Sequence, residues 1–414
     1  MKTFNSLIIL ICLTLILSIN VNAQHKLRAT GFMEYLNNTW IPSNVYQTIG
    51  FDEWQNQSTI YNRINIWWTP IENLEFHAGI RNNFTFGPLV AQYNKLFNYA
   101  DLVTYDDGYL DLTWKISSDN SNVLYTNLDR LNLKWTQDKF ELTVGRQRIN
   151  WGTNFVWNPN DIFNAFNYFD FNYIERPGSD AVLLEYYTGD FSSLQLAGKL
   201  SYRQELIDSL TLKKKLGITA AAMYKFNKWS YDIQFFGGVM QTDITAGLGW
   251  SGNIVGAGFT GEASWFRDID NFSDTTGILI ASIGANYIFK NQLMVNMSVI
   301  YNSNGSTGKA YYNNSGMLGS FSNIFSSSLN VKNLTPSRFD IFGQLSYPAT
   351  PLINVSLSGM FNPYDKSSYI GPSTTFSLTD NITLLLVGQL FFGEKLTEFG
   401  DYGKMFFLDL KWNF

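Results

Sequence analysis

The sequence has 414 residues and a formal net charge of −5, with 45% hydrophobic and 16% aromatic residues. A net acidic balance argues against a nucleic-acid partner. One cysteine (Cys12) and two histidines (His25 and His77) provide neither a disulfide framework nor the ligands of a zinc site, so no metal or cofactor is expected.

Residues 1–23 are typical of a secretory signal peptide. Lys2 supplies a positive start, residues 7–19 an apolar core, and Val21-Asn22-Ala23 a small-residue cleavage site. Cleavage removes one lysine and no acidic residue, which leaves residues 24–414 with a net charge of −6. Those residues contain no further run of about 18 apolar residues, so no membrane-spanning helix is expected in the exported chain.

The exported chain alternates between apolar and polar residues over many short stretches, which is the period of two-faced β-strands. Such stretches include residues 28–36, 60–68, 74–80, 131–135, 216–226, 293–301, 339–347, 353–361 and 384–391. They predict about 16 strands, in a range of 14 to 18. An even number is expected because both ends of a bacterial outer-membrane barrel lie on its periplasmic side.

Two long stretches interrupt this pattern because their residues do not alternate. Residues 86–107 form an aromatic excursion that ends at Asp106-Asp107-Gly108, and they are the weaker of two candidates for a segment inside the barrel. Residues 302–336 are rich in Ser, Asn and Gly and are predicted to form an exposed loop.

The stretch that begins at Lys139 starts as a strand and then changes character. Phe140, Leu142 and Val144 alternate with polar residues, but unbroken alternation would place Arg146 and Arg148 on the apolar face. A β-bulge at Gly145 would turn both arginines to the polar face. The alternative is that both lie beyond the membrane edge, where they reach water or pair with acidic residues.

The second candidate for a lumen segment is the loop 152–179, which is far longer than a usual hairpin connection. Its many aromatic residues carry too much apolar surface to remain in water. Asn158-Pro159-Asn160-Asp161 is turn chemistry that can cap a short helix over residues 162–173. We therefore expect an ordered loop folded against or into the lumen.

The last residues, 406–414, form a strand with apolar residues on one face and end in Phe414. Together with Trp412, this terminal phenylalanine resembles the sorting signal by which the barrel-insertion machinery recognises Gram-negative outer-membrane proteins. The sequence thus predicts an all-β protein, a single transmembrane antiparallel β-barrel over residues 24–414. In a bilayer such a sheet must close, and with 14 to 18 strands its interior is too wide for strand side chains to fill.

Taken with that strand, Gly145-Arg146-Gln147, Trp151-Gly152 and Trp157-Asn158-Pro159 resemble porin-like outer-membrane barrels related to alginate-export proteins, especially those of Bacteroidota. The resemblance implies that Arg146 and Arg148 lie on the lumen wall beside the loop 152–179. Alginate-export barrels have a markedly basic lumen, and a net acidic chain with one short arginine pair departs from that pattern.

These features favour a channel in the cell outer membrane for passive or facilitated diffusion of small polar solutes, with the loop as its constriction. Opposed charges would set a transverse field across the pore. The pore residues predicted for this field are Arg146, Arg148, Asp161, Asp170, Glu175, Arg176 and Asp180. Each acid could instead anchor the loop to an arginine. Trp151, Trp157, Tyr168 and Tyr173 could stack on a solute, or they could pack the interior of the loop.

Two other classes of function were weighed. An enzyme is not expected, because no G-x-S-x-G motif is present and His77 beside Glu75 reads as lumen wall. A barrel plugged by its own loops, acting as an interaction or assembly partner, is the alternative that the sequence leaves open. The expected partners are the lipid bilayer, the insertion machinery and a small polar solute. Whether the barrel is a monomer or a homo-oligomer also stays open.

Overall fold

A computed structural model describes residues 27–414, except residues 49, 97, 166–167, 172, 174, 207–211, 274–275 and 311–329. The predicted signal peptide, residues 1–23, and much of the predicted loop 302–336 lie outside the described residues. Among the described residues, no helix is long and apolar enough to cross a membrane.

One antiparallel sheet contains all the strands of the described chain. They are β1 (Leu27–Ile41), β2 (Gln55–Ile71), β3 (Leu74–Phe86), β4 (Thr113–Asp119), β5 (Asn122–Gln137), β6 (Phe140–Gln147), β7 (Ser179–Gly189), β8 (Ser192–Leu206), β9 (Leu212–Lys228), β10 (Tyr231–Met240), β11 (Asp243–Ile254), β12 (Ala257–Asp268), β13 (Ile278–Ile288), β14 (Met294–Asn302), β15 (Phe339–Thr350), β16 (Ile353–Phe361), β17 (Ser368–Ser377), β18 (Ile382–Phe392) and β19 (Lys404–Asn413). The short helices are α2 (Asn44–Thr48), α3 (Pro88–Leu96), α4 (Tyr99–Val103) and the 3₁₀ turn η2 (Val331–Asn333).

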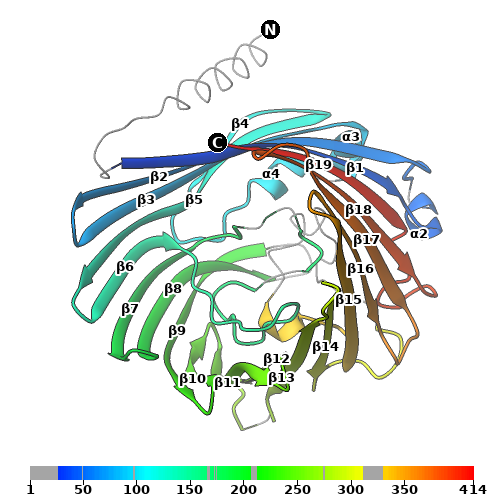
Figure 1. Ribbon diagram of the computed structural model, residues 1–414. Helices are drawn as coiled ribbons and strands as arrows, with labels where there is room; N and C mark the ends of the chain where they lie inside the picture. Colours follow the sequence, from blue (N-terminus) through cyan, green and yellow to red (C-terminus); the bar gives the residue numbers. More distant parts are fainter. Residues whose placement is uncertain are drawn as a thin grey trace.

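The sheet closes because β1 pairs with β19, with Phe32 opposite Asn413 and Ile41 opposite Lys404. Of the nineteen described strands, β4 pairs only with β5, so the closed ring visible in Figure 1 has eighteen strands. The predicted total of about 16 was therefore too low, although eighteen is the upper limit of the predicted range. Alternation locates strands well but fails to count them over residues 86–130, where α3, α4, β4 and the first half of β5 follow one another without a regular pattern.

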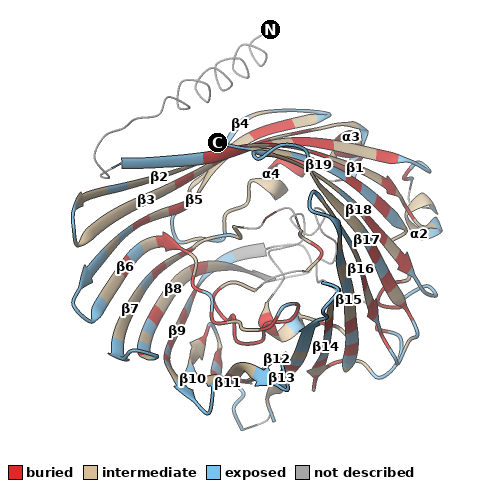
Figure 2. Ribbon diagram, viewed as in Figure 1, coloured by how far each residue is buried: buried red, intermediate tan, exposed pale blue. Residues whose placement is uncertain are grey.

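The two faces of the ring differ in polarity. Large apolar side chains are exposed on the outside of strands all round the ring, among them Leu133, Leu196, Leu248, Val299, Leu357 and Leu408. Buried side chains of the inner face are largely polar, among them Asn62, Asn82, Thr245, Ser264, Ser282 and Asn296. Figure 2 shows buried and exposed residues in turn along many strands. An apolar outer face around a polar interior is typical of membrane barrels.

The two ends of the ring also differ. Tight turns such as Glu72-Asn73, Asp138-Lys139 and Val255-Gly256 join strands at the end where β1 begins and β19 finishes. Longer connections, including residues 42–54, 87–112, 148–178 and 303–338, join strands at the opposite end, which we call the loop end.

Near the loop end, part of the wall is formed by a segment that is not a strand. β6 ends at Gln147 and β7 begins at Ser179, so both stop short of the level that β5 and β8 reach. Residues 106–112 pass over β6 and β7: the Leu128 N–H donates to Leu112 O on one side, and the Tyr202 N–H donates to Asp107 O on the other. This segment therefore bridges β5 and β8 in place of strand pairing. The chain beyond β6 is left to turn into the ring.

The bulge predicted at Gly145 is not found. Pairing of β6 with both β5 and β7 runs through Gly145 without a shift, although Gly145 has a φ of 114°. The extra residue lies on the neighbouring strand β5, where Leu128 and Arg130 face consecutive residues of β3 and Asp129 is unpaired.

Candidate functional site

Residues 148–178, called the lumen loop below, leave the wall at the end of β6, cross the inside of the ring and return at β7. Figure 1 shows this segment in the space that the strands surround. Its side chains and backbone bond to residues of β5, β8, β10, β11, β12, β13 and β18. The lumen loop covers the predicted loop 152–179 almost completely. Its described residues 162–173 form turns rather than the helix expected there.

Glu262 on the inner face of β12 is the strongest polar anchor of the lumen loop. Its carboxylate, 1% exposed, accepts hydrogen bonds from the backbone N–H of Thr153, from the N–H of Asn154 at 2.9 Å and from the N–H of Asn160 at 2.9 Å. The Thr153 hydroxyl donates a fourth bond at 3.0 Å. One buried carboxylate thus accepts from three loop N–H groups; those of Thr153 and Asn160 would otherwise lack an acceptor, whereas the Asn154 N–H also donates to Asn158 Oδ1 at 2.9 Å.

Further hydrogen bonds tie the same half of the loop to neighbouring strands. They run from Gln234 Nε2 to Trp151 O at 2.6 Å, from Asn160 Nδ2 to Leu248 O at 3.0 Å, from Asn154 Nδ2 to Ser282 Oγ at 2.8 Å and from Lys199 Nζ to Phe163 O at 2.8 Å. This half of the loop is therefore fixed to the wall from β8 to β13.

Aromatic side chains fix the rest of the loop. Trp151 packs against Phe163 and Phe236, and Phe169 packs edge-on against Tyr369 of β17 with ring centroids 4.9 Å apart. Of the four aromatic residues predicted either to stack on a solute or to pack the loop, Trp151, Trp157 and Tyr173 are buried. Only Tyr168 is partly exposed. The structure thus uses most of these rings as the core of the loop.

Arg146 and Asp180 lie together, but in the wall at the edge of the loop. Arg146, 5% exposed, donates from Nε to Asp180 Oδ1 at 2.7 Å and from Nη1 to Asp106 Oδ2 at 2.7 Å. Its Nη2 also donates to Leu110 O at 2.5 Å. Burial alone would raise the pKa of Asp106, but hydrogen bonding to Arg146 and its charge lower that pKa overall. This closed network holds residues 106–112 over β6 and β7.

Arg148, Asp161 and Arg176 form a charge group within the lumen loop. Burial raises the pKa of Asp161 to about 7, although the charge of Arg148 opposes the shift. Burial and then the neighbouring Arg148 lower the pKa of Arg176 to about 10. Arg148 is partly exposed and forms no ion pair with a described residue.

Three wall arginines that the sequence did not single out lie where the second half of the loop meets the wall. Arg81 and Arg130 contact the loop, and Arg63 acts on it only through Asp129. Arg63 of β2 lies opposite Arg81 of β3, and Arg130 lies on the adjacent β5. Arg130 Nη2 donates to the backbone oxygens of Glu175 and Arg176, the latter at 2.9 Å. The sequence signal that could have brought Arg63 and Arg81 together is the tight turn at Glu72-Asn73, because it sets the register that places the two residues opposite each other.

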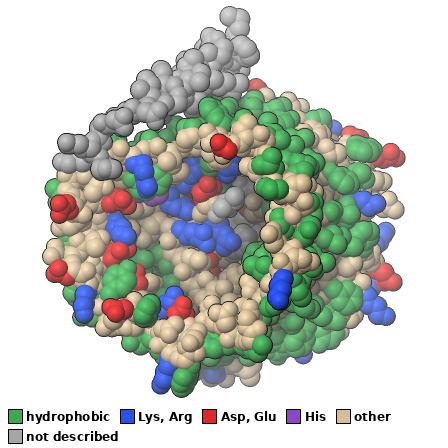
Figure 3. Space-filling model, in the orientation of Figure 1, with side chains coloured by type: hydrophobic (Ala, Val, Ile, Leu, Met, Phe, Trp, Pro, Cys, Tyr) green, Lys and Arg blue, Asp and Glu red, His purple; other side chains and the backbone are tan. Residues whose placement is uncertain are grey.

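Aromatic and acidic groups offset the charge of these arginines. The Arg81 guanidinium lies 4.0 Å from the Tyr173 ring centroid, and Arg63 forms an ion pair with Asp129. The Tyr173 hydroxyl donates to Asp129 Oδ2 at 2.9 Å. Burial raises the pKa of Asp170 to about 7, against the charges of Arg81 and Arg176. Figure 3 shows Lys and Arg side chains gathered in the mouth of the ring, with acidic side chains beside them.

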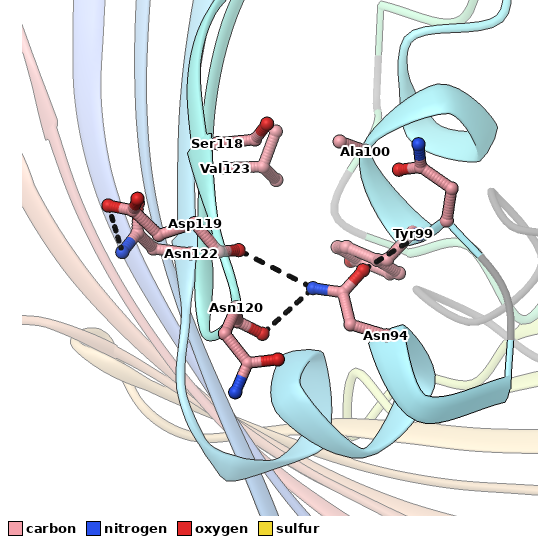
Figure 4. Close-up of a pocket in the computed structure, with 9 residues that line it drawn as sticks. Asn94, Tyr99, Ala100, Ser118, Asp119, Asn120, Asn122 and Val123 are labelled. Atoms are coloured by element: carbon pink, nitrogen blue, oxygen red, sulfur yellow. Dashed lines mark hydrogen bonds between the residues drawn. The ribbon is translucent and has the colours of Figure 1, made fainter.

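The excursion predicted at residues 86–107 carries α3 and α4. Together with the β4–β5 hairpin it lines a cavity of about 310 Å³. Figure 4 shows Asn94 bridging it: its Nδ2 donates to Asn120 O at 2.8 Å, and its Oδ1 accepts from the Tyr99 N–H at 3.0 Å. These bonds close the excursion onto the β4–β5 hairpin, while Tyr93 and Tyr99 pack with residues of β1 and β2 in the buried core. The amide of Asn94 is fully used in this closure.

The histidine of the wall lies against an aromatic ring. His77 stacks on Trp67 with ring centroids 4.7 Å apart and planes 10° apart. Within the described part of the chain, no group of His, Cys, Asp or Glu side chains has the arrangement of a metal site.

Comparison with known proteins places the fold but not the family. No protein family and no curated protein matches the sequence. Among solved structures, OccAB1 of Acinetobacter baumannii is 11% identical, with a TM-score of 0.55 over 94% of this chain and 96% of its own. OccK5 (OpdH) of Pseudomonas aeruginosa is 9% identical, with a TM-score of 0.58 over 93% and 97%. OprD of Pseudomonas aeruginosa is 8% identical, with a TM-score of 0.56 over 95% and 97%. The likeness is one of fold.

Proposed function

We propose that the chain is a porin-like channel of the outer membrane, through which small polar solutes pass by passive or facilitated diffusion. The observation that carries the proposal is a polar ring of eighteen strands crossed by an ordered loop that is bonded to its inner wall. A ring of that size encloses more space than its strand side chains fill. The solved barrels that share its fold are outer-membrane porins of Gram-negative bacteria, which supports the proposal.

The lumen loop is the constriction in this proposal. It lies across the ring between the long connections and the tight turns, so a solute must pass beside it. Arg148 and Arg176 with Asp161 and Asp170 supply opposed charges along this passage, and such charges select ions by sign. Arg146 and Asp180 serve the wall instead, and Glu175 contributes its backbone oxygen as an acceptor for Arg130.

Export and insertion complete the proposal. Residues 1–23 direct export, and the barrel-insertion machinery recognises the last strand, which ends in Trp412 and Phe414. In the folded chain Phe414 exchanges two backbone hydrogen bonds of 2.9 Å with Gly31, so the terminal residue also helps to close the ring. A Bacteroidota origin, the resemblance to alginate-export barrels and homo-oligomerisation stay predictions.

The test is single-channel conductance of the purified protein in a planar bilayer. The wild type is compared with a variant in which residues 153–176 are replaced by a short Gly-Ser linker, and with Phe191→Ala in a tight turn as a control for handling. Steady conductance that rises in the shortened variant supports the channel and its constriction.

Two results would count against the proposal. If neither form conducts, the chain is a plugged barrel, and its role is that of an interaction or assembly partner. If both forms conduct equally, the chain is a channel whose constriction lies elsewhere.

A further inference from the structure

Among the described aromatic side chains of the lumen loop, one is largely exposed. Phe155 is 55% exposed, whereas Asn154 and Val156 on either side of it are buried. Asn154 is fixed by hydrogen bonds to Glu262 and to Ser282, so the backbone at this point is held against the wall. The Phe155 side chain therefore projects from a fixed stretch of backbone into the interior of the barrel.

The rings beneath and beside Phe155 are held in place. Its centroid lies 6.1 Å from that of Phe342, a fully buried residue of β15, and 6.4 Å from that of Tyr168. Tyr168 packs edge-on against Phe342, with ring centroids 5.1 Å apart. Phe155 and the partly exposed Tyr168 thus form one surface supported from below by Phe342, which we call the aromatic platform.

The platform lies on the side of the lumen that is nearer the loop end. Phe342 is the fourth residue of β15, which begins at Phe339 directly after the long connection 303–338. A solute that enters through the loop end meets this half of the lumen first. Elsewhere the lumen loop uses its aromatic residues as core, so an exposed ring at a held position is not required to fold the loop.

We propose that the aromatic platform binds solutes through a flat apolar ring face, and that the preferred ligands are small solutes that carry an aryl group. This inference rests on the proposed channel function and names the class of solute that the channel delays. An aryl ring can stack in an offset or edge-on arrangement on Phe155, an attraction beyond simple burial of area.

The probes are phenyl β-D-glucoside and methyl β-D-glucoside, which share the sugar and differ in the ring. Affinity is measured by calorimetry on the detergent-solubilised protein, and residence time by current block in a planar bilayer. The wild type is compared with Phe155→Ala, with Phe155→Leu, which is apolar but has no flat ring, and with Phe155→Trp. Phe191→Ala, which removes a phenyl ring that is 77% exposed in the turn between β7 and β8, is the matched control.

We expect the wild type to bind the phenyl glucoside more tightly than the methyl glucoside. Phe155→Ala and Phe155→Leu should weaken binding of the phenyl glucoside by about three- to tenfold, while Phe155→Trp and Phe191→Ala keep it. Affinity for the methyl glucoside should be the same in every variant.

Equal wild-type affinity for the two glucosides, or an unchanged affinity in Phe155→Leu, would overturn the inference. The calorimetric result stands apart from conduction. A silent barrel that still binds the phenyl glucoside through Phe155 would refute the channel and keep the platform. A conducting barrel with no preference would do the reverse.

Discussion

Replacing Glu262 is the most direct way to test how the lumen loop is held. In Glu262→Ala, the N–H groups of Thr153 and Asn160 lose their acceptor, while the Asn154 N–H keeps Asn158 Oδ1; each group left without an acceptor costs about 1–3 kcal/mol if it stays dry. Water can enter a barrel interior, so the lower end of that range applies and a total of about 2 kcal/mol is expected. That change raises the opening equilibrium of this half of the loop by about 30-fold.

Glu262→Gln is the graded companion of this variant. Three of the four loop hydrogen bonds reach Oε1, and only the Asn160 N–H reaches Oε2. An amide oriented with its oxygen at the Oε1 position keeps three bonds and sets an N–H against the Asn160 N–H. We therefore expect a loss of about 1–2 kcal/mol, confined to the contact with Asn160.

The assay is amide hydrogen exchange followed by mass spectrometry over peptides that cover residues 150–165. Exchange should accelerate about 30-fold in Glu262→Ala and about tenfold in Glu262→Gln, while peptides of β15 to β19 keep their protection. Glu72→Gln, in an exposed tight turn, is the control for loss of a carboxylate. Unchanged exchange over residues 150–165 in Glu262→Ala would refute the idea that this carboxylate holds the loop.

Further variants and conditions test the charges and the backbone. Arg148→Glu should shift the reversal potential in a salt gradient toward cation selectivity. Arg146→Glu should instead lower the temperature at which the barrel unfolds on a gel, because Asp106 and Asp180 would then face a third carboxylate. Equal shifts in reversal potential from both variants would contradict the assignment of Arg148 to the pore and Arg146 to the wall. Burial raises the pKa values of Asp161 and Asp170 to about 7, so a fall from pH 8 to pH 6 protonates both carboxylates. The lumen then loses negative charge, and ion selectivity should move toward anions. The double variant Asp161→Asn with Asp170→Asn should abolish this pH dependence. The same raised pKa values mean that the two carboxyls stabilise the folded loop most at low pH, and that this contribution declines as pH rises from about 4 through 7, which exchange at pH 5 and pH 8 can measure. Gly145→Ala should lower the unfolding temperature by an amount equivalent to about 1–2 kcal/mol or more, since Gly145 has a φ of 114° and an added methyl group would meet Leu131 O; an unchanged temperature would show that the backbone there relaxes freely.

Alternation predicted where strands lie because burial in a two-faced sheet acts on each residue locally. The long aromatic loop could be predicted for the converse reason, since a stretch without alternation but with many large rings has to be buried inside the fold. The placement of Arg146 could not be predicted in this way. Its partner Asp106 lies 40 residues earlier, on a segment that crosses the wall only because β6 and β7 are short.

The wall arginines show a second limit of sequence reasoning. Arg63, Arg81 and Arg130 each occupy an ordinary polar position of a strand, and nothing local distinguishes them. Their gathering around Asp129 and Tyr173 depends on the register of three strands and on the extra residue at Asp129. Similarly, Phe155 and Trp157 are equivalent loop aromatics in the sequence, and only the hydrogen bonds that fix the loop to Glu262 at Asn154 and Asn160 decide which of the two side chains is exposed.

The two halves of the lumen loop are held by different chemistry, and this difference allows them to be separated. The half around Thr153 to Asn160 depends on Glu262, whereas the half around Tyr173 depends on Arg81, whose guanidinium lies on the Tyr173 ring, and on Arg130. Phe155 belongs to the first half. Glu262→Ala should therefore weaken binding of the phenyl glucoside as well as accelerate exchange, because the platform loses its fixed backbone. Arg81→Ala should accelerate exchange over residues 168–178 and leave phenyl glucoside affinity within about twofold of the wild type, since contacts that share no partner act nearly independently. A loss of affinity in Arg81→Ala as large as in Glu262→Ala would show that the loop moves as one body.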